Sequence, residues 1–242
     1  MNRESIIQAI EESVLPADLK KDSIQATESG DIVSGEDALQ SGMVPKKIVA
    51  GSFDPATFGH KWLIQRALES DPDAGILIVS STGKSQEYQL FHTAVRAALL
   101  RSYGIKMRMI LVGQDDSRDR QKLLSQLHQS AETIVKGRRT RLDSEHTDSL
   151  SGKYQLKNGH FEEVQCPDDL IQVSSGDVKG LLTLFLQDNQ LPDHDVHKLR
   201  QSVSDVVAKC TLSAIQQRST QQNAIYLDRL RAGSSEALFA QA

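Results

Sequence analysis

Short runs of aliphatic and β-branched residues alternate with longer amphipathic runs through the middle of the chain. Runs typical of buried strands occupy residues 46–50, 74–81, 107–112 and 131–135. Apolar residues at helical spacing recur over residues 61–68, 88–103 and 118–129. Strands that alternate with helices indicate right-handed βαβ units and a parallel sheet. We therefore predict an α/β fold, a doubly wound parallel sheet, over residues 46–205.

The two ends of the chain have a different pattern. In residues 1–45, Ile6, Ile10 and Val14 form one stripe of a short helix, and the stretch beyond Pro16 is rich in Ser, Gly, Asp and Glu. We predict an N-terminal helix followed by a loosely structured linker. The stripe serves either as a docking or oligomer contact or as a face packed on the main domain. Residues 206–242 are Gln-rich with apolar residues at near-helical spacing, and they predict one helix that folds onto the domain or a neighbouring subunit.

The turn that follows the first strand of the domain carries the clearest candidate chemistry. Its sequence is Gly51-Ser52-Phe53-Asp54-Pro55-Ala56-Thr57-Phe58-Gly59-His60, and an amphipathic run comes directly after it. A strand that feeds a helix through such a turn gathers backbone N–H groups at the helix N-terminus, where an anion is stabilised. Thr57 and His60 are three residues apart, so both can face one phosphate group.

Further polar segments follow later strands or open later helices. Lys84 follows the second strand, and Lys136, Gly137 and Arg139 follow the fourth. Because ligands of parallel sheets bind at the carboxyl ends of the strands, these residues are candidates for phosphate binding. The alternatives are a surface lysine at position 84, and a nucleic-acid patch or a solvated helix start at 136–141.

A serine pair, Ser174 and Ser175, precedes the apolar helix around residues 181–185. Two hydroxyls at a helix N-terminus suit a triphosphate, although a serine there is also an ordinary helix cap.

Composition narrows the class of protein. The 242 residues are 38% hydrophobic and 25% charged, with a formal net charge of -4, which suits one domain of ordinary size with appendages. A mildly acidic chain lacks the basic face that nucleic acids require. Cys166 and Cys210 have no metal or redox spacing, and no apolar run is long enough for a membrane span or a signal peptide. We expect a cytoplasmic protein that binds neither nucleic acid nor membranes.

The pattern Gly-Ser-Phe-Asp-Pro-x-Thr-x-Gly-His resembles the signature of the nucleotidyltransferase superfamily that carries the T/HxGH motif. Threonine at position 57 makes it most similar to the phosphopantetheine adenylyltransferase branch. Three later segments support the resemblance. They are Lys136-Gly137-Arg138-Arg139 with Asp143 and Glu145, Val173-Ser174-Ser175-Gly176-Asp177-Val178-Lys179, and Leu191-Pro192 with Val196. The second of these is similar to the superfamily's Ile-Ser-Ser-x-x-Val-Arg signature.

This resemblance implies a Rossmann-like nucleotidyltransferase fold, adenylyl transfer from ATP to a phosphorylated small-molecule acceptor, Mg2+ on the phosphates and a homo-oligomer. No residue is predicted to be a ligand of a protein-bound metal. The catalytic residues it implies are His60, Lys84 and Arg139. The acceptor phosphate would be bound by Ser52, Lys84 and Lys136. The nucleotide would be bound by Gly51, Ser52, Phe53, Thr57, Gly59, His60, Gly137, Arg139, Ser174 and Ser175.

Two other functions remain open at the level of sequence. The same motifs serve nicotinamide-mononucleotide adenylyltransferases and the cytidylyltransferases for glycerol phosphate or choline phosphate. A nucleotide-binding domain that has lost turnover and acts through its appendages is the other alternative. His146 and Thr147 stand where the family has an aromatic residue and a glutamate, and the family's tryptophan before the serine motif is absent. These departures put nucleotide contacts at those positions in doubt.

Overall fold

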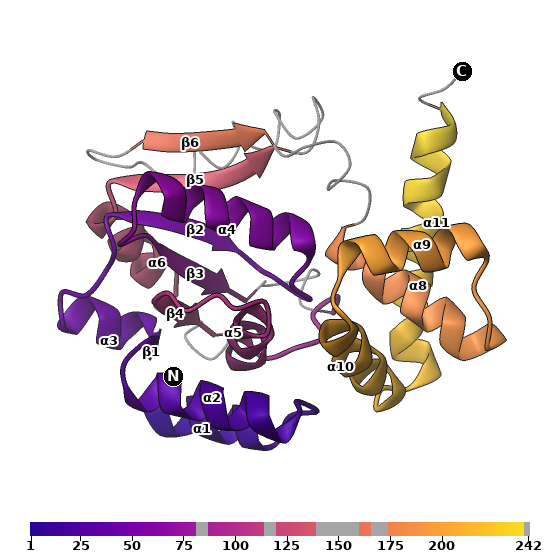
Figure 1. The fold of residues 1–242 in the computed structure, drawn as a ribbon, viewed down its shortest axis with the longest axis horizontal. Coiled ribbons are helices and arrows are strands. Elements are labelled where there is room, and N and C mark those ends of the chain that lie inside the picture. The colour runs from indigo at the N-terminus through magenta and orange to yellow at the C-terminus, as the bar shows by residue number, and fades with distance from the viewer. Residues whose placement is uncertain (81–86, 114–119, 139–159, 166–173, 240–242) are drawn as a thin grey trace.

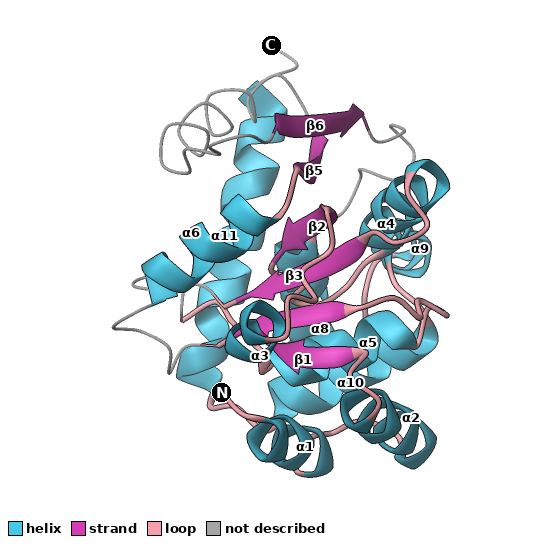
Figure 2. Cartoon of the chain, turned by 90° about the vertical axis from the view of Figure 1, so that its left-hand side faces the viewer, coloured by secondary structure: helices cyan, strands magenta, loops and turns pink. Residues whose placement is uncertain are grey.

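A computed structural model describes residues 1–80, 87–113, 120–138, 160–165 and 174–239. Its centre is one six-stranded sheet in the order β1-β4-β3-β2-β5-β6, in which every pair of neighbours is parallel (Figures 1 and 2). The strands are β1 (Ile32–Ser34), β2 (Lys47–Gly51), β3 (Gly75–Val79), β4 (Met109–Val112), β5 (Thr133–Arg138) and β6 (His160–Gln165). The predicted doubly wound parallel sheet is therefore confirmed.

Helices cover both faces of the sheet because its strands are apolar on both sides. On one face, Val49 and Ile76 belong to a core that also includes apolar residues of α4 (Phe58–Ser70) and α5 (Thr93–Arg101). On the other face, Ile48 and Leu77 belong to a second core with α3 (Gly35–Gln40) and α6 (Arg120–Ser130). Successive strand residues point to opposite faces, so each short run of strand sequence contributes to both cores.

The N-terminal residues are more ordered than their composition indicates. α1 (Arg3–Glu11) and α2 (Ala17–Glu28) form a pair that packs on α5, and Ile6 and Ile10 are fully buried. β1 then joins the sheet beside β4, with Val33 opposite Ile110. The expectation of a loosely structured linker is wrong, because this stretch forms α2, β1 and α3. The sequence left two roles open for the apolar stripe of α1, a docking contact or packing on the main domain. The burial of Ile6 and Ile10 shows that it packs on the main domain.

The C-terminal third of the chain forms four helices in its described residues. They are α8 (Ser175–Asp188), α9 (Asp193–Ser202), α10 (Asp205–Gln216) and α11 (Thr220–Phe239). They gather beyond the ends toward which the strand arrows point, at the carboxyl edge of the sheet (Figure 1). The expectation of one helix over residues 206–242 is wrong, because a turn at residues 217–219 divides it into α10 and α11. Within the described residues no helix is both long and apolar enough to cross a bilayer.

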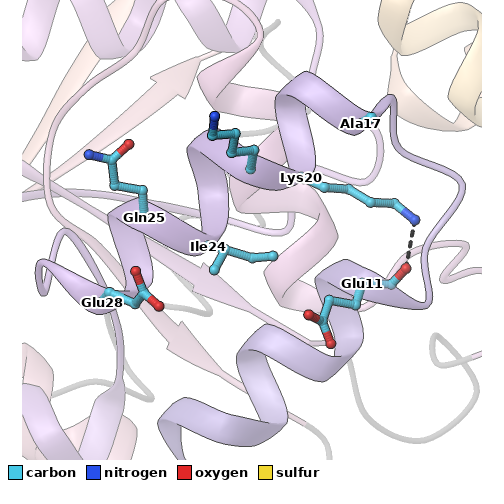
Figure 3. A pocket seen from close by; sticks show the side chains of 7 residues that line it. Glu11, Ala17, Lys20, Ile24, Gln25 and Glu28 are labelled. Atoms are coloured by element: carbon cyan, nitrogen blue, oxygen red, sulfur yellow. Dashed lines mark hydrogen bonds between the residues drawn. The ribbon is translucent and has the colours of Figure 1, made fainter.

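A cavity of about 740 Å3 lies on the α1–α2 pair, far along the chain from the candidate motifs (Figure 3). Ile24, Gln25 and Glu28 of α2 line it together with Glu11, whose carbonyl oxygen accepts a hydrogen bond from Lys20 Nζ at 2.6 Å. Its lining carries no residue of the turn between β2 and α4, so we do not assign the candidate chemistry to it.

Candidate functional site

The turn between β2 and α4 is held in an unusual shape by its own side chains. Phe53 has a positive φ of 51°, a conformation that few residues other than glycine adopt, and its ring is buried. A Cβ atom at Gly51 would lie only 3.0 Å from that ring, so a larger residue at position 51 would require the ring of Phe53 to shift. The Phe53 ring also meets the His60 ring edge-on, with centroids 5.0 Å apart. The turn is therefore packed around Phe53 and His60.

Thr57 and His60 fix each other at the start of α4. Thr57 caps the helix and accepts a hydrogen bond from the His60 N–H at 3.4 Å, while the Thr57 N–H donates to His60 Nδ1 at 3.0 Å. An Nδ1 that accepts a hydrogen bond carries no proton, so in the neutral ring the proton lies on Nε2. The capping interaction thus makes Nε2 a hydrogen-bond donor. Gly59 lies in the same first turn, where backbone N–H groups have no partner within the helix.

The serine pair lies directly beside this turn, although it is more than a hundred residues later in the chain. Ser174 caps α8 and accepts a hydrogen bond from the Asp177 N–H at 3.1 Å. Ser175 Oγ donates to the carbonyl oxygen of Pro55 at 2.8 Å. The start of α8 is therefore in contact with the turn that leads into α4, and each of these helix N-termini is a positive dipole end.

Asp54, Arg96 and Lys179 form a buried ionic cluster next to the contact between α8 and the turn before α4. Asp54 is only 4% exposed, and its carboxylate accepts a hydrogen bond from Lys179 Nζ of α8 at 3.1 Å. Arg96 of α5 is fully buried and has its Nε atom 3.7 Å from the same carboxylate. Burial lowers the pKa of Arg96, and the charge of Asp54 opposes that shift. One carboxylate thus faces two cations, and the surplus positive charge favours an anion bound nearby.

The same cluster holds the segment of residues 87–91, which follows β3. The Asp54 carboxylate accepts hydrogen bonds from the Leu90 N–H at 2.8 Å and from the Phe91 N–H at 3.0 Å. Arg96 donates to the carbonyl oxygens of Phe91 at 2.7 Å and Ser52 at 3.2 Å. α5 begins at Thr93 and not at residue 88 as the periodicity indicates. The N–H groups of residues 90 and 91 bind a carboxylate, and His92 caps the helix.

The cluster was not identified from the sequence. Asp54 and Lys179 belong to the two motifs, but neither was assigned a role. Arg96 carried the clearest signal, since it is the one charged residue in the otherwise apolar run of residues 94–100. A charge inside such a run indicates a buried ion pair.

Of the remaining candidates, Lys136 and Gly137 lie within β5 and not after the strand as the sequence predicts, because β5 extends to Arg138. β5 runs beside β2, with Val135 opposite Val49, and continues through Lys136 and Gly137. Ser52 is exposed at the end of β2. Lys84 and Arg139 lie outside the described residues, so the structure does not place them. The residues that it does bring together are Gly51, Ser52, Phe53, Thr57, Gly59 and His60 with Ser174 and Ser175.

Comparisons with known proteins identify the family to which the chain belongs. A family profile described as cytidylyltransferase-like matches residues 48–204. The phosphopantetheine adenylyltransferase of Chromobacterium violaceum is 31% identical over 142 residues, which are 57% of this chain and 82% of that protein. A solved structure of Plasmodium falciparum nicotinic acid mononucleotide adenylyltransferase complexed with NaAD is 12% identical, with a TM-score of 0.42. That alignment covers 69% of this chain and 94% of the other.

Proposed function

Because the chain belongs to the cytidylyltransferase-like nucleotidyltransferase family, we propose that it transfers AMP from ATP to phosphopantetheine and releases pyrophosphate. Membership of this family implies a nucleoside triphosphate as one substrate. The choice of acceptor rests on Thr57 in the first motif and on the similarity to the bacterial phosphopantetheine enzyme. In this proposal the protein is a cytoplasmic enzyme of coenzyme A biosynthesis that works as a homo-oligomer.

One observation carries the proposal: the hydrogen bond from Ser175 Oγ to the Pro55 carbonyl oxygen, 2.8 Å long. It joins the N-terminus of α8 to the turn that leads into α4, so two anion-binding helix ends share one site. A nucleotide with several phosphate groups fits such a site better than a ligand with a single charge does, because each helix end stabilises a separate phosphate.

In the proposed reaction an oxygen of the acceptor phosphate attacks the α-phosphorus of ATP in line. A new P–O bond forms, the bond from the α-phosphorus to the bridging oxygen breaks, and pyrophosphate leaves with that electron pair. The attacking phosphate is already an anion, so the site requires no covalent nucleophile. His60 Nε2 donates a hydrogen bond to the α-phosphate as its charge rises. Ser52, Lys84 and Lys136 bind the acceptor phosphate, and Gly137, Arg139, Ser174 and Ser175 bind ATP.

Magnesium ions would neutralise charge on the phosphate groups of the bound nucleotide. In the described part of the chain, no three His, Cys, Asp or Glu residues lie close enough to hold a metal ion together. Mg2+ commonly binds phosphates and water with few protein carboxylates. The described residues are compatible with that mode, and we assign no protein ligand to the ion.

The direct test is pyrophosphate release measured with ATP or CTP against a panel of acceptors. The panel contains phosphopantetheine, nicotinamide mononucleotide, glycerol phosphate, choline phosphate and a reaction without acceptor. We expect turnover with ATP and phosphopantetheine. Dephospho-coenzyme A and pyrophosphate should form in equal amounts.

The other possible outcomes of this assay each support a different function. Turnover with nicotinamide mononucleotide or with CTP and an alcohol phosphate would move the chain to another branch of the family. Binding of ATP without turnover of any acceptor would contradict enzymatic function and favour a nucleotide-binding interaction protein.

A further inference from the structure

The C-terminal helices α10 and α11 lie beyond the part of the chain that the family profile matches, which ends at residue 204. They nevertheless reach the candidate site. Arg218, in the turn between them, donates hydrogen bonds to the carbonyl oxygens of Gln89 at 3.0 Å and Glu87 at 3.3 Å. The extension thus binds the backbone of the segment that also binds Asp54.

Tyr226 of α11 connects Arg218 to the buried ionic cluster. Its side chain is fully buried, and its hydroxyl accepts a hydrogen bond from Arg218. The Arg218 guanidinium lies 5.2 Å from the ring centroid, and the Lys179 ammonium lies 5.1 Å from it. Burial raises the pKa of Tyr226 to about 12, so at neutral pH its ring is uncharged. One aromatic ring therefore contacts both cations, each in a cation–π arrangement.

Lys179 completes the connection to the turn of the first motif. Its Nζ atom donates to the Asp54 carboxylate at 3.1 Å and to the carbonyl oxygen of Tyr88. Every residue from 87 to 91 thus has a backbone group in a long-range hydrogen bond. Arg218 binds the carbonyls of residues 87 and 89, Lys179 that of residue 88, and Asp54 the N–H groups of residues 90 and 91. Side chains from three separate parts of the chain fix this one segment.

Close packing between α8 and α11 keeps the connection in place (Figure 1). A Cβ atom at Gly180 would lie 2.8 Å from Leu230 Cβ and 3.0 Å from the Tyr226 carbonyl oxygen. A residue larger than glycine at position 180 would therefore force α11 away from α8 and move Tyr226 relative to Lys179. Gly180 follows Lys179 directly, so the contact between the helices is closest where the cluster lies.

We propose that the α10–α11 extension is a positioning element for the nucleotidyl transfer reaction, in which Arg218 and Tyr226 hold the segment 87–91 and, through Lys179 and Asp54, the turn that carries His60. The expected effect of the extension on turnover rests on the proposed function. In this proposal the extension acts on the reaction through Lys179 and Asp54 and not by contact with a substrate. It limits the movement of groups that contact the substrate, and such positioning contributes to kcat because small displacements misalign the reacting atoms.

The first test compares Arg218→Gln and Tyr226→Phe with Arg200→Gln, which removes the same charge from an exposed site on α9. We expect Arg218→Gln to lower kcat about tenfold while KM for ATP changes less than about twofold, because a misplaced transition-state donor affects kcat first. Tyr226→Phe keeps the ring and should lose less activity than Arg218→Gln. Arg200→Gln should behave as the parent protein. An unchanged kcat in folded Arg218→Gln, or an equal loss in Arg200→Gln, would overturn the proposal.

The second test measures hydrogen exchange in peptides that cover residues 87–93, and it does not depend on turnover. Arg218→Gln and Gly180→Ala should each accelerate exchange there, whereas Arg200→Gln should not. Unchanged exchange would refute the positioning role even if the parent protein transfers AMP. Faster exchange with no turnover of any acceptor by the parent protein would refute the proposed function and, with it, the link to catalysis.

Discussion

His60 uses its two ring nitrogens for different purposes. Nδ1 accepts the Thr57 N–H and closes the capping box of α4, and this bond leaves the proton on Nε2 for the phosphate. A substitution at position 60 therefore affects both the helix cap and the proposed chemistry. The two effects can be separated, because glutamine is a preferred residue at the same position of a capping box.

We predict that His60→Ala and His60→Gln both lower kcat, and that only His60→Ala loses stability. Loss of one transition-state donor should cost His60→Ala on the order of 10²–10³ in kcat. Loss of the hydrogen bond from the Thr57 N–H to the side chain at position 60 should cost it about 1 kcal/mol in the free energy of unfolding. His60→Gln keeps a cap and should unfold as the parent protein does. Steady-state kinetics and urea unfolding measure the two effects, and full activity in either variant would remove His60 from its catalytic role.

The carboxylate of Asp54 should be the most important single charge for stability in the described residues near the site. Asp54→Asn leaves Arg96 and Lys179 buried without their anionic partner, which should cost about 3–5 kcal/mol. The matched control is Glu69→Gln, which removes the exposed ion pair with Arg66 and should cost less than about 1 kcal/mol. Denaturant unfolding of both variants gives the comparison. Equal losses would show that the buried cluster is no more important than a surface pair.

At the scale of whole elements, the sequence was informative where an element has a periodicity of its own. The apolar runs of β2 to β5 and the helices between them were predicted from their pattern. β1 was not, because three residues are too few for an alternation, and it forms only against the edge of β4. The start of α5 was misplaced for a similar reason: the carbonyl oxygens of residues 87–89, which a helix would pair with N–H groups four residues later, accept hydrogen bonds from Arg218 and Lys179, which are distant in sequence.

Attachment of α2 to α5 gives a prediction about pH. The hydrogen bond from Arg101 holds the pKa of Asp22 below its ordinary value of 3.8. A carboxyl group with a lowered pKa in the folded state contributes stability above its ordinary pKa and loses that contribution as the pH falls through the lowered value. Because Asp22 is partly exposed, Asp22→Asn should cost about 1 kcal/mol at neutral pH.

The loss in Asp22→Asn should be constant from neutral pH down to about pH 5 and should shrink below the ordinary pKa of 3.8. Thermal unfolding across this range, with Glu69→Gln as a surface control, measures the difference. A loss that stays constant in acid would show that Asp22 acts through packing and not through its charge.

At the scale of the whole molecule, one of the two hydrophobic cores contains residues from the N-terminal helices, the sheet and the C-terminal helices. That core includes Ile6 and Ile10 of α1, strand residues such as Val49 and Ile76, and Tyr226 of α11. Segments from both ends of the chain are therefore buried in the same core as residues of the sheet. The contact between the first motif and the serine motif also depends on how the whole molecule folds. The sequence identified both motifs, but the Ser175–Pro55 contact and the proposed role of Arg218 depend on tertiary packing that no local pattern encodes.

We predict that the protein unfolds in a single transition. A continuous core makes the N-terminal pair, the sheet and the C-terminal helices dependent on one another. Scanning calorimetry should give a calorimetric enthalpy equal to the van't Hoff enthalpy. Two resolved transitions would show that one of the appendages unfolds independently.

Nucleotide binding should raise the stability of the whole molecule. ATP with Mg2+ at a hundred times its Kd should add about 2.7 kcal/mol to the free energy of unfolding. A chelator should weaken this stabilisation by ATP. It should not change the melting temperature of the protein measured without nucleotide, since the described residues form no metal cluster. A chelator-induced loss in the protein without nucleotide would indicate a structural metal.

The strand β1 has a practical consequence for work with shortened forms of the protein. A fragment cut to the limits of the family match, residues 48–204, would lack β1. The backbone of β4 would then be an open edge, ready to pair with the same edge of another fragment. The same cut would remove Tyr226 and expose Lys179 to solvent. Such a fragment should aggregate when overexpressed, so crystallisation trials are better begun with residues 1–242.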